Sequence, residues 1–122
     1  GGIFDLDNPE NPFAGWSMIY VPYCTGDVHI GNSTTEYSPE LTVQHKGRVN
    51  GDAAVSYLVD NFPDATDVVV AGASAGSIAT PLFGGLVGDQ LPDAHITVFG
   101  DGSGGYPSVP GVNALIGNAW ER

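Results

Sequence analysis

The sequence predicts an α/β domain in which a parallel β-sheet is flanked by helices. Two runs of mainly apolar, β-branched residues, 67–71 and 95–100, are typical of buried strands. They alternate with longer segments that have helical character. Strands and helices that alternate along a chain form parallel sheets covered on both faces. At 122 residues, the chain has the length of one domain.

The N-terminal third is expected to contain one buried strand between two loops. Residues 1–15 are rich in Asp, Asn, Pro and Gly, which predicts an irregular lead-in. Residues 16–21, WSMIYV, are aromatic and β-branched and stop at Pro22, so they predict a buried strand. Residues 22–40 show no sustained period and predict a long loop, with a short strand near residues 41–45.

Two helices are expected on either side of the second strand. The first spans about residues 51–61 and is amphipathic, because its apolar residues recur at helical spacing. These residues are Val55, Leu58, Val59 and Phe62. A second helix of small and apolar residues is expected over about 74–87, where Pro81 predicts a kink or a break. Residues 101–111 predict a second long loop, and residues 112–121 a short helix.

Composition excludes several classes of partner. The formal charge is −11, with 14 acidic residues against only Lys46, Arg48 and Arg122. Binding to nucleic acid or to an anionic membrane surface needs clustered cations, so we expect neither. No apolar run has the length of a membrane span, and no Cys/His cluster has zinc spacing, so we expect no membrane span, no metal and no cofactor. The acidic, Lys-poor composition favours an extracellular or cell-envelope location.

Residues 68–81, VVVAGASAGSIATP, place a serine in a small-residue turn between a predicted strand and a predicted helix. This is the context of the G-x-S-x-G nucleophile elbow, which makes Ser74 the predicted nucleophile and the Ala75 backbone N–H an oxyanion donor. Side chains at Gly72 or Gly76 would be expected to collide with neighbouring backbone. The alternative is a glycine-rich turn whose serine caps the helix.

A serine nucleophile needs a base, and the chain has three histidines. His95 begins its predicted strand and should therefore lie at the opposite edge of the sheet from Ser74. His45 is expected to be a loop residue satisfied by backbone groups. His29 follows the first predicted strand, at the edge where Ser74 lies, and is a candidate for the substrate pocket. None is a convincing general base, which suggests that the chain is part of a longer hydrolase.

Two acidic residues are further candidates for the pocket. Asp101 follows the third predicted strand directly, and Asp27 lies in the loop after the first. Either could contact substrate at the carboxyl edge of the sheet. The alternatives are that Asp101 belongs to the DGSGG turn and that Asp27 and His29 only brace their loop. Cys24 is expected to be buried or paired, and its partner cannot be assigned from this chain.

Three stretches together resemble one known family. WSMIYVPYCTGDVHIGN at residues 16–32, the His45–Gly47–Asn50 stretch and VVVAGASAGS are similar to the pectin acetylesterase family, which also contains the Notum carboxylesterases. The resemblance covers about residues 2–106. It implies an α/β-hydrolase fold and a serine carboxylesterase, with Ser74 as nucleophile and the Ala75 amide as oxyanion donor.

The resemblance also implies that residues 1–122 form a single partial α/β-hydrolase domain. The triad Asp and His would come from the rest of the same polypeptide or from another chain, and this piece alone is expected to be inactive. The expected substrate is an acylated carbohydrate or another small ester. The alternative is a hydrolase-like protein that binds or assembles without catalysis.

Overall fold

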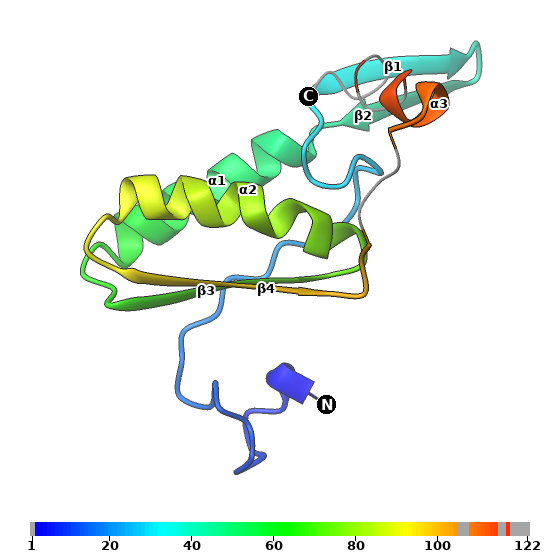
Figure 1. The fold of residues 1–122 in the computed structure, drawn as a ribbon. Helices are drawn as coiled ribbons and strands as arrows, with labels where there is room; N and C mark the ends of the chain where they lie inside the picture. The colour runs from blue at the N-terminus through cyan, green and yellow to red at the C-terminus, as the bar shows by residue number, and fades with distance from the viewer. Residues whose placement is uncertain (1, 105–107, 115–116, 118–122) are drawn as a thin grey trace.

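The computed structural model describes residues 2–104, 108–114 and 117, and Figure 1 shows their arrangement. The elements follow one another as η1 Gly2–Phe4, β1 Ser33–Ser38, β2 Leu41–His45, α1 Gly47–Asn61, β3 Asp67–Ala73, α2 Ala75–Gln90, β4 His95–Asp101 and α3 Pro110–Ala114. Strands β3 and β4 form a small sheet, and the two long helices α1 and α2 form a layer on it. Strands β1 and β2 form a separate antiparallel hairpin.

The predicted parallel pairing is confirmed for β3 and β4. Their register runs from Asp67 opposite His95 to Ala73 opposite Asp101, so both strands end at the same edge. Val98 of β4 lies against Gly84 of α2, which places α2 directly on the sheet. Because β-branched side chains fit a pleated surface beside a helix, the VVV run forms a strand here.

The expectation that helices cover both faces is wrong for the described residues. Helices α1 and α2 lie on the same side of β3 and β4 (Figure 1). The other face has no helix over it in this part of the chain, and Phe99 is 61% exposed. Side chains alternate between the two faces of a strand, so a single helical layer buries only half of them. Strands β3 and β4 are therefore not fully buried.

The strand predicted over residues 16–21 is absent from the described structure. Trp16 and Tyr20 are instead exposed, Tyr20 by 71%, and the segment is extended without ladder partners. Its aromatic rings pack on the N-terminal turns, with Trp16 edge-on to Phe13 at 5.3 Å and Tyr20 edge-on to Phe4 at 5.8 Å. Composition can favour a strand, but a strand forms only where a neighbour accepts its backbone hydrogen bonds.

Part of the long loop predicted over residues 22–40 is the strand β1, which was missed. It pairs with β2, the short strand that was expected, and Thr34 donates a hydrogen bond across the pair to Gln44 at 2.7 Å. Threonine and tyrosine have high strand propensity, but the surrounding glycine, proline and serine obscured the pattern. This hairpin brings His45 to the end of the Pro22–Asn32 loop.

The two long helices form where the sequence predicts them, but their ends differ from the predicted ones. Helix α1 begins at Gly47, one turn before the predicted start, and α2 continues to Gln90 through Pro81. Helix α3 overlaps the start of the helix predicted over residues 112–121; most of the rest of that prediction lies outside the described residues. In the part of the chain described here, no helix combines the length and apolarity needed to cross a bilayer.

Candidate active site

Ser74 connects β3 to α2 through a strained turn. Its φ is 52° and its ψ is −117°, a conformation that residues with a side chain seldom adopt. The turn is held from two sides. The Ser74 N–H donates to the Asp101 carbonyl at 2.8 Å, and the Ser74 carbonyl accepts from the Ser77 N–H at 3.0 Å and the Ser77 hydroxyl at 2.8 Å. Strain of this kind persists only where the surroundings impose it, and it is typical of functional sites.

The Ser74 side chain does not cap helix α2. It makes no capping hydrogen bond within the described residues, although Ser74 occupies the N-cap position. Capping residues ordinarily have extended backbone angles and bond the N–H of the second or third helical residue, which Ser74 does not. The alternative of an N-capping serine is therefore wrong, and the hydroxyl is exposed at the surface.

Gly72 permits the close approach between strand and helix, but Gly76 is not needed for it. A Cβ built on Gly72 would clash with the carbonyl carbon of Gly76 and lie 2.9 Å from the backbone nitrogen of Ser77. A Cβ on Gly76 meets no described atom within 4 Å outside its own helix. The predicted collision is confirmed at Gly72 and wrong at Gly76: the Gly76 backbone lies against Gly72, but the position that a Gly76 Cβ would take is open in the described structure.

Ala75 is the first residue of α2. The first N–H groups of a helix have no intrahelical acceptor, and the helix dipole makes this end positive. Ala75 comes directly after Ser74 in the sequence, and its N–H lies at the positive end of α2. This N–H is therefore suited to donate a hydrogen bond to a developing oxyanion.

Two of the three histidines are positioned away from a catalytic role. His95 begins β4, opposite Asp67, and six residue steps separate it from Asp101, which is about 20 Å along a strand. This confirms that it lies at the opposite edge from Ser74. His45 is buried, with Nδ1 2.7 Å from the Thr25 carbonyl and Nε2 2.7 Å from the Tyr37 hydroxyl. Because a carbonyl only accepts, Nδ1 carries a proton and both nitrogens are occupied.

Asp101 and Asp27 have different environments. Asp101 ends β4 beside Ser74, is exposed, and positions Ser74 through its backbone carbonyl. Asp27 has 0% exposure. Its carboxylate accepts hydrogen bonds from the Thr25 hydroxyl at 2.5 Å, the Gly47 N–H at 2.7 Å and the His29 N–H at 3.1 Å. Asp27 therefore braces its loop and has no exposed atom with which to touch a substrate in this structure.

His29 is half-buried in the same loop, in the left-handed conformation with φ 61°. Its ring packs against Tyr23, with 4.8 Å between ring centroids. Burial lowers the pKa of His29 below its ordinary value of 6.5, and the nearby Asp27 charge opposes this effect only in part. The imidazole is therefore biased toward its neutral form, which can both donate and accept a hydrogen bond.

We expect acidification to destabilise the protein through His29. The lowered pKa means that the unfolded chain binds a proton near pH 6.5 while the folded protein resists it, so stability falls as the pH drops below 6.5 and levels off below the folded-state pKa. Thermal melts of the wild type and His29→Gln between about pH 7.5 and about pH 5 test this. The variant should lose less stability on acidification, and equal losses would contradict the assignment.

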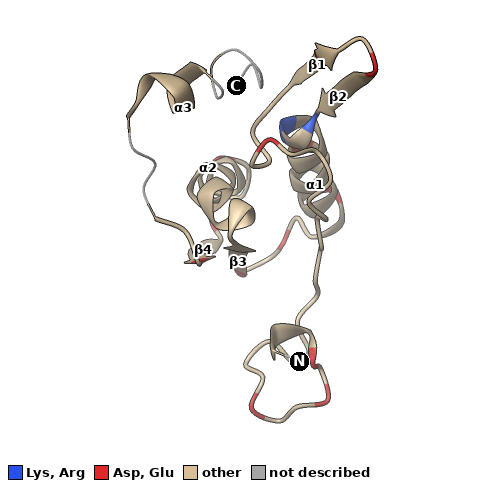
Figure 2. Cartoon of the chain, turned by 90° about the vertical axis from the view of Figure 1, so that its right-hand side faces the viewer, with Lys and Arg blue, Asp and Glu red and all other residues tan. Residues whose placement is uncertain are grey.

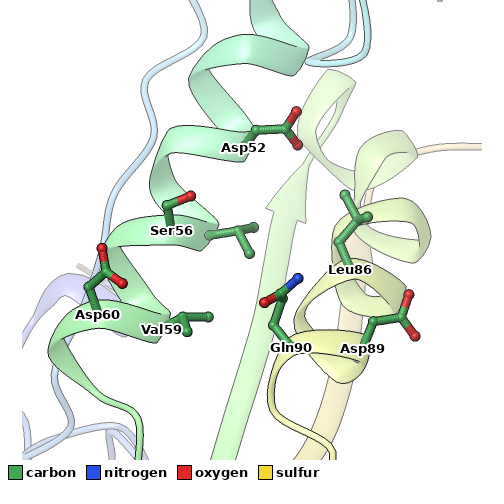
Figure 3. Close-up of a pocket in the computed structure, with 8 residues that line it drawn as sticks. Asp52, Ser56, Val59, Asp60, Leu86, Asp89 and Gln90 are labelled. Atoms are coloured by element: carbon green, nitrogen blue, oxygen red, sulfur yellow. The ribbon is translucent and has the colours of Figure 1, made fainter.

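Two clefts of the described structure lie away from Ser74. One, of about 360 Å³, separates the middle of α1 from the end of α2 (Figure 3). It is lined by Asp52, Val55, Ser56, Val59, Asp60, Leu86, Asp89 and Gln90. The other, of about 280 Å³, lies where β3 and β4 begin. Within the described ranges no three His, Cys, Asp or Glu side chains are grouped to hold a metal ion. Neither of these clefts is lined by Ser74, which is itself exposed.

Acidic residues are spread over several elements, whereas Lys46 and Arg48 both lie at the start of α1 (Figure 2). Arg48 is paired with Asp52 at 2.8 Å. Cys24 is exposed, which corrects the expectation that it is buried; pairing with a cysteine outside this chain stays a prediction.

Comparison with known families agrees with these features. The model of the pectinacetylesterase family matches residues 1–110. The chain belongs to the pectinacetylesterase family. No curated protein and no solved structure matched it. In this pectinacetylesterase-family chain, the match includes both the strained Ser74 turn and the loop that contains Asp27 and His29, as the resemblance predicted.

Sequence reasoning missed how the Asp27 loop is built. The three donors to Asp27 come from its own loop and from the start of α1, 20 residues later. Only the hydrogen bond from the His29 N–H could have been predicted from the sequence, because an Asp side chain commonly accepts a hydrogen bond from the backbone N–H two residues later. The contact with Gly47 depends on tertiary structure.

Proposed function

We propose that this chain carries the nucleophile of a serine carboxylesterase that removes an acyl group from a carbohydrate or related substrate. The observation that supports this best is the backbone of Ser74, which is strained, held by Asp101 and Ser77, and leaves the hydroxyl exposed instead of capping α2. Membership of the pectinacetylesterase family supports ester hydrolysis, an acylated carbohydrate as substrate, and an extracellular location. An α/β-hydrolase fold for the whole domain is part of the same proposal.

The reaction would proceed through an acyl-serine intermediate. The Ser74 Oγ attacks the ester carbonyl carbon and loses its proton to a base, and the tetrahedral oxyanion accepts a hydrogen bond from the Ala75 N–H. The alcohol leaves with a proton, and water then attacks the acyl-serine and releases the acid. The base and its orienting acid would be a His and an Asp from the rest of the same polypeptide or from another chain.

Covalent labelling tests the proposal. In the complete protein, a fluorophosphonate probe should label Ser74, because the probe's phosphorus is attacked by an activated serine hydroxyl. Peptide mapping should locate the adduct on Ser74, and Ser74→Ala should remove it.

The control variant is Ser56→Ala, which alters an exposed serine of α1 that lines the cleft away from Ser74. It should still be labelled. Undiminished labelling of Ser74→Ala would overturn the assignment of the nucleophile. Absence of labelling and of ester hydrolysis in the complete wild-type protein would favour a hydrolase-like protein that binds or assembles without catalysis.

A further inference from the structure

A buried carboxylate organises the loop between residues 22 and 32. Asp27 is fully buried and accepts three hydrogen bonds, from Thr25, His29 and Gly47. Burying a charge is unfavourable unless its oxygens are hydrogen-bonded, so such a residue contributes to a fixed geometry only while all its donors are in place. The Gly47 N–H belongs to the first residue of α1, where the helix dipole also favours an anion.

The geometry that Asp27 fixes is a strained one. Val28 and His29 both have left-handed backbone angles, with φ of 58° and 61°. This conformation is a genuine outlier for a β-branched residue such as valine, and it persists only where the surroundings impose it. The Val28 N–H donates to the Tyr23 hydroxyl at 3.2 Å, and the His29 N–H donates to Asp27. The strained pair is thus held through both of its N–H groups.

The start of α1 leaves no space for the loop to relax. A Cβ on Gly47 would clash with the Asp27 carboxylate and lie 2.6 Å from the His29 Cα. The loop therefore packs against the helix end at backbone distance. Figure 1 shows this loop at the end of the sheet where β3 and β4 finish and α2 begins, the end that carries Ser74.

We infer that Asp27 is a positioning residue, which holds the Val28–His29 turn on the start of α1 and thereby fixes the orientation in which His29 contacts the substrate beside Ser74. This inference rests on the proposed esterase function. His29 is the residue of this turn that a substrate can reach: it is only half-buried, its ring packs against Tyr23, and its neutral form can hydrogen-bond an ester or a hydroxyl group. Asp27 itself contacts no substrate.

A double-mutant cycle in the complete protein tests the inference. Asp27→Asn keeps the shape of the side chain but directs an NH₂ group toward at least one donor, which should release the turn. Asp27→Asn and His29→Ala should each lower kcat/KM about tenfold to a hundredfold, mainly through KM. Because Asp27 acts through His29, the double variant should be no worse than His29→Ala alone. The substrates are acetylated pectin and p-nitrophenyl acetate.

If the losses in kcat/KM of the two single variants multiply in the double variant, on both substrates, the inference is overturned. Asp27 would then have only a general structural role. Asp64→Asn, the same change at an exposed position after α1, is the matched control and should leave kcat/KM unchanged. If Asp27→Asn does not fold, Thr25→Val removes one donor only and should show the same non-additivity with His29→Ala. Failure of the esterase proposal would be distinct, because wild-type protein would then show neither probe labelling nor turnover.

Discussion

Replacing Ser74 with alanine in the complete protein is expected to lower kcat by on the order of a million-fold. The physical reason is that the acyl-enzyme route depends on one oxygen, and no other described hydroxyl occupies the strained turn between β3 and α2. Hydrolysis of p-nitrophenyl acetate and of acetylated pectin measures the effect. The melting temperature should change little, because the Ser74 side chain caps nothing in the described structure.

The 122-residue chain by itself provides the contrasting case. Here we expect wild type and Ser74→Ala to hydrolyse p-nitrophenyl acetate equally slowly. His45 has both nitrogens occupied and His95 lies at the far edge of the sheet, so neither can take the proton from Ser74. Clear Ser74-dependent turnover by this chain would contradict that expectation and would identify His29, or a group from a second copy, as the base.

Gly72→Ala is expected to destabilise the protein by about 1–3 kcal/mol, the usual range for overpacking, and to lower kcat/KM about a hundredfold. The added methyl would collide with backbone atoms of Gly76 and Ser77, which cannot rotate away as a side chain could. Helix α2 would have to move away from β3, taking the Ala75 N–H and the Ser74 turn with it. Denaturant unfolding and ester hydrolysis, measured on the same preparation, check both parts.

Gly85→Ala is the matched control, because Gly85 also lies in this strand–helix unit but a Cβ there meets no described atom within 4 Å outside its own helix. It should stabilise α2 by about 0.5–1 kcal/mol, since alanine is the better helix former, and leave activity unchanged. If Gly72→Ala proved as harmless as Gly85→Ala, the close strand–helix contact would not be what maintains the Ser74 turn.

The sequence alone determined the parts of this protein that depend on local pattern. The VVV run and the HITVFG run are strands because β-branched residues favour them, and the spacing of Val55, Leu58 and Val59 produced α1. The GASAG turn placed Ser74 between a strand and a helix. The stretches around residues 16–32 and 68–77 carried the family resemblance, which the match over residues 1–110 confirmed.

Only the tertiary structure decided what depends on contacts between distant residues. Residues 16–21 have strand composition, but without ladder partners in the described structure their aromatic rings pack on the N-terminal turns instead. The strained turn at Ser74 is held by the hydrogen bond that its N–H donates to the carbonyl of Asp101, 27 residues away. Asp27 became a brace instead of a pocket residue because Gly47 of α1 supplies its third donor. Burial and hydrogen-bond partners of this kind are properties of the packed chain, since a carboxylate's role depends on which donors folding brings to it.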